Sequence, residues 1–132
     1  MRLTLAEMID GQRAEIGSGS GATAVEGACV DSRAVEPGAL FVGLPGEQAD
    51  GGLFAPDALR AGAGAALVGR HVWDAISEEC RANGWHVAVA HDPLKVLQAA
   101  GRHALGRLGD TVVAITGSVG KTTTKDILVA ML

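Results

Sequence analysis

Aromatic residues are scarce in this chain of 132 residues, which has two Phe, two Trp and no Tyr. Flat side chains on which bases or sugars could stack are therefore few. Cysteine is equally rare, and Cys29 and Cys80 are too few and too widely separated to indicate a disulfide framework. We expect both to be buried thiols in a reducing cytosol.

An excess of positive charge is also missing, because the formal net charge is −4. A general nucleic-acid binder needs a basic surface to replace counterions, so we expect no nucleic-acid partner. No stretch has the length of a membrane span, and the N-terminus lacks the apolar segment of a secretory signal. Hydrophobic residues make up 48% and charged residues 20%, which indicates an ordinary soluble protein. We expect a cytoplasmic monomer.

The hydrophobic pattern predicts alternating strands and helices. Thr4 and Glu7 form a capping box for a helix over residues 5–10, which Gly11 ends. We expect a flexible turn over residues 17–23 and a tight turn at Pro37-Gly38. The other predicted elements are strands over 25–30, 39–44, 65–68, 86–90 and 111–116, and helices over 54–61, 71–82 and 93–108.

This order predicts an α/β fold with mostly parallel strands. We place a domain boundary after the last of these helices, near residues 108–110. Residues 1–108 are predicted to form a small domain with its own core. Residues 109–132 supply one strand, one loop and one helix, which cannot form a core alone. We therefore expect the chain to be the N-terminal piece of a longer protein.

The end of the chain contains a candidate phosphate-binding loop, "TGSVGKTT" over residues 116–123. Glycines let backbone N–H groups approach phosphate oxygens, and the following helix N-terminus favours an anion. Lys121 is predicted to reach the β- and γ-phosphates, and the Thr122 hydroxyl to ligate Mg²⁺. Ile115 stands where the full motif has glycine, so this is a shortened variant, and a glycine-rich turn with an incidental Lys is the alternative. The predicted nucleotide-binding residues are Gly117, Ser118, Val119, Gly120, Lys121, Thr122 and Thr123.

A second motif lies upstream of this loop, the pattern "DSRAVEPGALFVGLPGEQADGGLF" over residues 31–54. Together they resemble the Mur ligases of peptidoglycan synthesis. That family consists of ATP-dependent, amide-forming enzymes with three domains: a small N-terminal α/β domain for the UDP-sugar substrate, a central P-loop ATPase domain and a C-terminal domain. The resemblance implies ATP and Mg²⁺ as cofactors and a UDP-N-acetylmuramoyl-peptide as a partner.

Within the family, Ser118 and the Lys125-Asp126 pair are most similar to the ligases that add D-alanyl-D-alanine to UDP-N-acetylmuramoyl-tripeptide. Gly46-Glu47 also suits these enzymes. The segment 48–50, "QAD", is instead similar to the ligases that add a diamino acid, which remain an alternative. Gly52 departs from both groups, in which His or Arg is common at this position.

The resemblance implies that a UDP pocket is lined by Asp31, Ser32 and Arg33 and by the loop 46–50, of which Gly46, Glu47 and Gln48 are the candidate substrate-binding residues. Ser32 is suited to donate to uracil or ribose oxygens. Arg33 can pair with a diphosphate or hold the loop through Asp31. The alternative is that Asp31-Ser32-Arg33 only forms a local turn on leaving a strand.

The mechanism implied by the resemblance begins with phosphorylation of the terminal carboxylate of the UDP-linked peptide by ATP. The amine of D-alanyl-D-alanine then attacks the acyl phosphate and phosphate leaves. Catalysis rests mainly on positioning and on charge neutralisation by Lys121 and Mg²⁺. Because other parts of this machinery lie beyond Leu132 in the family, we expect no ligase activity from the chain alone.

Two functions from other classes remain open, a UDP-sugar-binding module without catalysis and a small regulatory P-loop NTPase. Amide ligases of folate or cyanophycin metabolism are further alternatives within the ligase class. The histidines show no metal-ligand spacing, Glu78-Glu79 is predicted to be a solvated helix face, and Trp73 and Trp85 are expected to serve in packing.

Overall fold

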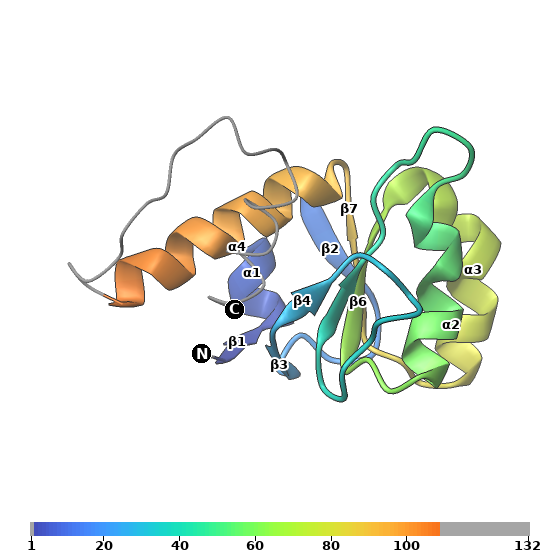
Figure 1. Ribbon diagram of the computed structural model, residues 1–132, viewed down its shortest axis with the longest axis horizontal. Helices are drawn as coiled ribbons and strands as arrows, with labels where there is room; N and C mark the ends of the chain where they lie inside the picture. Colours follow the sequence, from blue (N-terminus) through green and yellow to red (C-terminus); the bar gives the residue numbers. More distant parts are fainter. Residues whose placement is uncertain (1, 109–132) are drawn as a thin grey trace.

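The computed structural model describes residues 2–108, in which a five-stranded sheet lies between two layers of helices (Figure 1). The strand order is β2-β7-β6-β5-β4. β4 to β7 run parallel to one another, whereas β2 pairs antiparallel with β7. The strands are β2 (Ala14–Ser18), β4 (Ala28–Cys29), β5 (Leu40–Val42), β6 (Ala65–Gly69) and β7 (Val87–Ala90).

Helices cover both faces of the sheet. α1 (Leu5–Ile9) and α4 (Pro93–Leu108) pack on one face. The opposite face carries the 3₁₀ helix η1 (Gly51–Phe54), α2 (Ala55–Arg60) and α3 (Arg70–Ala82). A separate two-stranded ribbon pairs β1 (Arg2–Thr4) with β3 (Ala24–Glu26).

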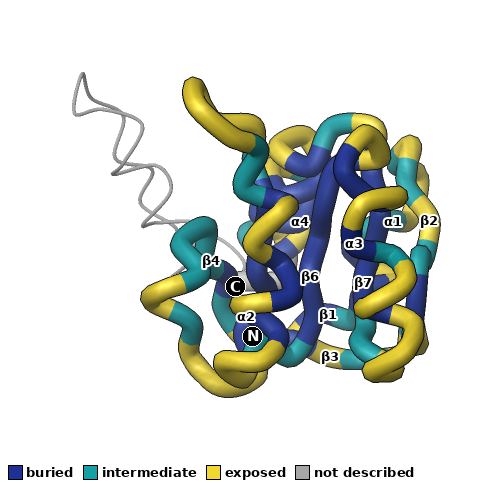
Figure 2. Tube along the Cα trace, turned by 90° about the vertical axis from the view of Figure 1, so that its right-hand side faces the viewer, coloured by how far each residue is buried: buried dark blue, intermediate teal, exposed yellow. Residues whose placement is uncertain are grey.

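Alternation along the central strands supplies both halves of the core, because successive strand side chains point to opposite faces. Leu40 and Val42 of β5 pack toward α1 and α4, whereas Phe41 between them packs toward α2 and α3. β6 is buried along its whole length, as a strand covered on both faces requires (Figure 2). The α/β class with a mostly parallel sheet is thus confirmed.

The predicted capping box is also confirmed. The Thr4 hydroxyl accepts from the Glu7 N–H at 3.1 Å, and a Glu7 carboxylate oxygen accepts from the Thr4 N–H at 2.8 Å. The turn at Pro37-Gly38 is closed by the Ala39 N–H, which donates to the Glu36 carbonyl at 3.1 Å, with Gly38 at a φ of 80°. Glycine tolerates this left-handed conformation without a Cβ clash.

Three sequence predictions need correction. Residues 25–30 are not one strand, because Gly27 at a φ of 76° separates β3 from β4, which belong to different sheets. The predicted turn over 17–23 begins two residues too early, since Gly17 and Ser18 end β2, a strand that the sequence analysis did not predict. The predicted helix 54–61 is two elements, η1 up to Phe54 and α2 from Ala55.

The cysteines differ in their surroundings. Cys80 is fully buried in α3, and burial raises the pKa of its thiol. Cys29 is only half-buried, contrary to expectation, because β4 is the edge strand of the sheet. Trp73 is 8% exposed and Trp85 packs on the same core cluster, so their predicted packing role is confirmed. Over residues 2–108, no helix is both long and apolar enough to cross a membrane.

Candidate functional site

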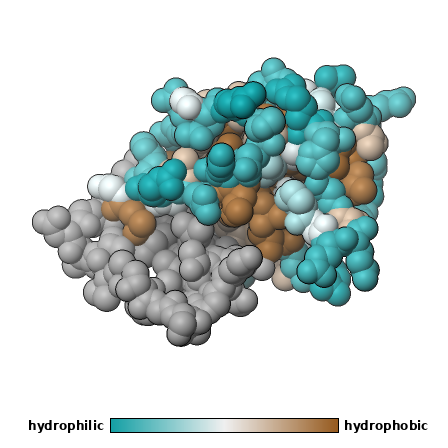
Figure 3. Space-filling model, turned by 90° about the horizontal axis from the view of Figure 1, so that it is seen from above, coloured by the Kyte–Doolittle hydropathy of each residue, from teal (hydrophilic) through white to brown (hydrophobic). Residues whose placement is uncertain are grey.

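The carboxyl ends of the parallel strands β4 to β7 meet at one edge of the sheet, where ligands commonly bind in open α/β folds. The segment after β4 carries Asp31, Ser32 and Arg33, and the segment after β5 carries the loop 45–50. Figure 3 shows the molecule from above, where polar side chains predominate and hydrophobic ones lie between them.

A cavity of about 750 Å³ opens beside the segment after β4, on the face of the sheet that carries α2. A volume of this size is within the usual range for small-molecule sites. One wall is the segment after β4, and the other is formed by η1 and the start of α2. Its lining residues are Val30, Asp31, Ser32, Arg33, Phe41, Gly51, Phe54 and Asp57. All three residues of the predicted Asp-Ser-Arg group thus line one cavity.

The turn that carries these residues is organised by Asp31. Its Oδ1 accepts the Arg33 backbone N–H at 2.9 Å, and its carbonyl accepts the Ala34 N–H at 3.1 Å. An aspartate that bonds the backbone two residues on holds a tight turn in place before any ligand arrives. The local-turn interpretation of this motif is therefore correct as far as the backbone is concerned, and it is compatible with a binding role.

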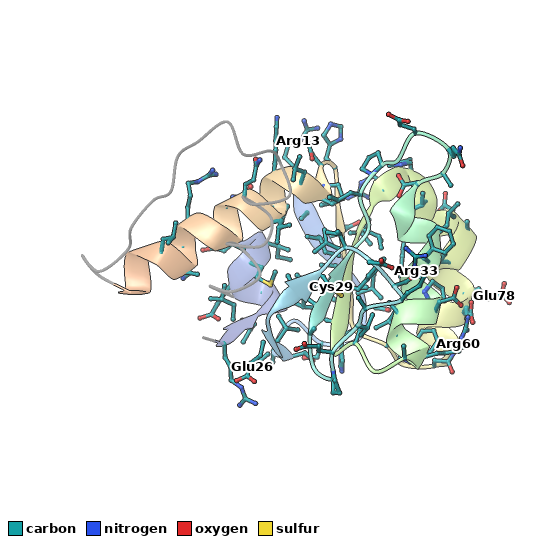
Figure 4. All side chains as sticks on the ribbon, viewed as in Figure 1. Arg13, Glu26, Cys29, Arg33, Arg60 and Glu78 are labelled. Carbon is teal, nitrogen blue, oxygen red and sulfur yellow. The ribbon has the colours of Figure 1, made fainter. Side chains whose placement is uncertain are left out.

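Arg33 forms a two-pronged contact with the Asp31 carboxylate. Its Nε donates to Oδ1 at 3.0 Å and its Nη2 donates to Oδ2 at 3.1 Å, and this hydrogen bonding raises the pKa of the guanidinium. The Arg33 side chain is 87% exposed, so the pair contributes little to folding stability. Figure 4 shows Arg33 on the side of the sheet where α2 and α3 lie. Its Nη1 donors remain available to an anionic ligand.

Ser32 is half-buried at the cavity wall. A hydroxyl can both donate and accept a hydrogen bond. Within the described residues the Ser32 hydroxyl does neither. The hydroxyl is therefore free to bond a ligand in the cavity.

The loop 45–50 leads from β5 to the second wall of the cavity. It is closed by the Gly46 N–H, which donates to the Ala49 carbonyl at 3.0 Å, and by a bridge between Pro45 and Asp50. Gly46, Glu47 and Gln48 are exposed and do not line the cavity. The structure therefore does not bring them together with Asp31-Ser32-Arg33, and their role in substrate binding stays a prediction.

Asp50 ties this loop to two helices. Its Oδ1 accepts the Gly52 N–H at 2.7 Å and so caps η1, and its Oδ2 contacts Nε2 of His71 in the first turn of α3. Gly52 is buried next to this contact. A Cβ at position 52 would lie 2.7 Å from Cγ2 of Val72, so Val72 occupies the space that a larger residue would need.

We expect Asp50→Ala to lower the free energy of unfolding by about 1–2 kcal/mol, because it removes a cap. The Asp50 side chain is 12% exposed, and the substitution also removes its contact with His71. Glu36→Ala is the matched control, since Glu36 is exposed in the turn before β5 and has no ion pair within the described residues. Urea unfolding followed by circular dichroism measures both. Equal stability of the two variants would contradict the capping role.

Five further cavity residues were not predicted from the sequence: Val30, Phe41, Gly51, Phe54 and Asp57. Of these residues, only Phe54 could have been proposed from the sequence, because it ends the family-like pattern and is one of only four aromatic residues in the chain. The predicted nucleotide-binding residues Gly117 to Thr123, with Lys121 and Thr122, lie outside the described residues, and their roles stay predictions.

The model of the "Mur ligase family, catalytic domain" matches residues 24–111, which include the whole cavity lining. This match covers more than half of the chain. The chain belongs to the Mur ligase family. It is 37% identical over 110 residues to the UDP-N-acetylmuramoyl-tripeptide--D-alanyl-D-alanine ligase of Bacillus subtilis (strain 168), covering 83% of this chain and 23% of the relative.

The chain is also similar to a second kind of Mur ligase. The chain is 42% identical over 98 residues to the UDP-N-acetylmuramoyl-L-alanyl-D-glutamate--2,6-diaminopimelate ligase of Lawsonia intracellularis, covering 72% of this chain and 19% of the relative. This Mur ligase chain thus spans about a fifth of the length of the curated relatives that it matches.

Solved Mur ligase structures share the fold. The MurF ligase from Thermotoga maritima in complex with ADP is 32% identical, with a TM-score of 0.55, and the match covers 76% of this chain and 21% of that one. MurF from Acinetobacter baumannii is 25% identical, with a TM-score of 0.66, and the match covers 94% of this chain and 26% of that one. Both likenesses support the family assignment.

Proposed function

We propose that this chain supplies the site for a UDP-linked substrate in an ATP-dependent ligase that builds peptidoglycan precursors. The observation that carries the proposal is the cavity in which Asp31, Ser32 and Arg33 lie together at the carboxyl edge of the sheet. We propose further that residues 1–108 are the substrate domain and that residues 109–132 begin an ATP-binding domain. In that domain Lys121 would contact ATP phosphates and Thr122 would ligate Mg²⁺.

Two of the cavity residues, Arg33 and Ser32, suit a nucleotide diphosphate. Arg33 is charged at physiological pH, as guanidinium groups are, and its Nη1 donors are suited to phosphate oxygens. The Ser32 hydroxyl is suited to an oxygen of uracil or ribose. Because Asp31 already fixes the turn, little ordering of this wall is needed when the ligand binds.

For the substrates we favour UDP-N-acetylmuramoyl-tripeptide and D-alanyl-D-alanine, supported by the Bacillus subtilis relative and by Ser118 with Lys125-Asp126. A diamino-acid-adding ligase is the second candidate. It is supported by the Lawsonia intracellularis relative and by the "QAD" segment over residues 48–50.

Calorimetric titration of the 132-residue chain tests these proposals. We expect heat of binding with UDP-N-acetylmuramoyl-tripeptide, and weaker binding to the corresponding dipeptide compound. Tighter binding of the dipeptide compound would favour the diamino-acid ligase. ATP binding with Mg²⁺, without any response to a UDP-linked compound, would overturn the substrate-site proposal.

Ser32→Ala is expected to weaken binding about fivefold, which corresponds to the loss of one hydrogen bond of about 1 kcal/mol. Ser77→Ala is the matched control, because Ser77 lies on α3 and does not line the cavity. Unchanged affinity in both variants would remove Ser32 from the proposed site.

A further inference from the structure

Three of the four aromatic side chains in this chain take part in the core. Phe41 is 1% exposed, Trp73 is 8% exposed, and Trp85 packs against the same cluster. Phe54 is different, because it is 46% exposed and lines the cavity beside Asp31, Ser32 and Arg33. Phe41 also lines this cavity but is buried in the core, so among the described residues Phe54 is the exposed aromatic side chain at the site.

The backbone around Phe54 is held on both sides. Before it, the Gly51 N–H donates to the Leu44 carbonyl at 2.8 Å, and Asp50 caps the same helix. After it, α2 begins at Ala55 with Pro56 in its first turn. A ring with only two side-chain torsions on an anchored backbone loses little conformational entropy when it contacts a ligand.

The composition of the cavity wall suits a flat ring with polar edges. Phe54 offers an apolar face, whereas Ser32 and Arg33 offer hydrogen-bond donors. Stacking on an aromatic side chain requires only the π-face of a base, and the polar groups around it can read the edge of the base. A sugar can also pack on an aromatic ring, but it has no π-face of its own.

We propose that Phe54 is the stacking surface for the uracil ring of the UDP-linked substrate. The inference rests on the proposed function and adds a specificity-determining residue to its site. The neighbouring Leu53 is equally exposed at 46% but does not line the cavity, which makes it a matched control on the same helix.

The test is calorimetric titration of UDP into the 132-residue chain and its variants. We expect Phe54→Ala to weaken UDP binding about tenfold or more. Phe54→Tyr keeps the ring and is expected to stay close to the unsubstituted chain, whereas Phe54→Leu keeps much of the volume and is expected to lose the stacking contribution. Leu53→Ala is expected to bind UDP as the unsubstituted chain does.

Two further measurements separate stacking from other losses. The uracil H5 and H6 protons of bound UDP are expected to shift upfield with the unsubstituted chain and not with Phe54→Leu. The affinity for inorganic pyrophosphate, which has no base, is expected to be the same for Phe54→Ala and the unsubstituted chain.

The outcomes distinguish this inference from the proposed function. Absence of UDP binding by the unsubstituted chain would overturn the proposed function itself. UDP binding that Phe54→Ala and Phe54→Leu leave unchanged would overturn the stacking role and retain the site. An equal loss of pyrophosphate affinity in Phe54→Ala would also overturn it, because the lost contact would then not involve the base.

Discussion

Replacing Gly43 by alanine is expected to lower the free energy of unfolding by about 3 kcal/mol, the upper end for inserting a group into a packed core. Gly43 is buried directly after β5 and passes against the backbone of η1. A Cβ at position 43 would lie 2.5 Å from the Gly52 nitrogen and closer still to the Gly52 Cα. Backbone atoms cannot rotate away, so the segment 50–54 must shift.

Gly106→Ala is the control for this substitution. Gly106 lies in α4, and apart from its chain neighbours and its own helix backbone no atom of the described residues lies within 4 Å of a Cβ built there. Alanine in a helix is favoured over glycine by about 0.5–1 kcal/mol, so Gly106→Ala is expected to raise stability slightly. Urea unfolding of both variants measures the difference. A Gly43→Ala variant as stable as Gly106→Ala would show that β5 and η1 do not touch as described.

Gly43→Ala also bears on the site, because η1 carries the second wall of the cavity. A shift of this helix moves Phe54 relative to Ser32. In conditions where the variant remains folded, we therefore expect weaker UDP binding as well.

Phe41→Ala is expected to be the second large effect, with a loss of about 3 kcal/mol in the free energy of unfolding. Phe41 is 1% exposed at the centre of β5 and is among the largest fully buried side chains of the described residues. Truncation removes its packing against the cluster of α2 and α3. We place the loss at the lower end for Phe→Ala, because the space left behind joins a cavity that is already open to water.

The matched variant is Phe54→Ala, which makes the same chemical change at the chain's other phenylalanine. Because Phe54 is 46% exposed, we expect this variant to lose about 1 kcal/mol of stability or less. Thermal unfolding and UDP titration should therefore separate the two variants. Phe41→Ala loses stability, and Phe54→Ala loses affinity. Equal stability losses in the two variants would contradict the burial that separates them.

Local signals in the sequence were sufficient for several elements. The Thr4–Glu7 capping box depends on residues three positions apart, so its pattern predicted the start of α1. The helix after Asp92 was predicted from Pro93 and from the spacing of apolar residues, and it begins as expected. The continuous apolar run of β6 also predicted a strand buried on both faces.

β2 illustrates where such signals fail. Its sequence "AEIGS" has no clear alternation, and it becomes a strand because β7 offers an unpaired edge. For residues 25–30 the pattern predicted too much order. It indicated one continuous strand, but the chain turns at Gly27 and its two halves join different sheets. In both cases the deciding partner lies far away along the chain.

By itself the sequence determined the α/β class, most of the elements and the family pattern, because these depend on composition and on short-range spacing. Only the tertiary structure decided which residues share a site. It placed Asp31, Ser32 and Arg33 in one cavity with Phe54, more than twenty positions away, and left Gly46, Glu47 and Gln48 on an exposed loop. The physical reason is that parallel pairing of β4 with β5 and the packing of η1 on the sheet determine those neighbours, and neither contact is local.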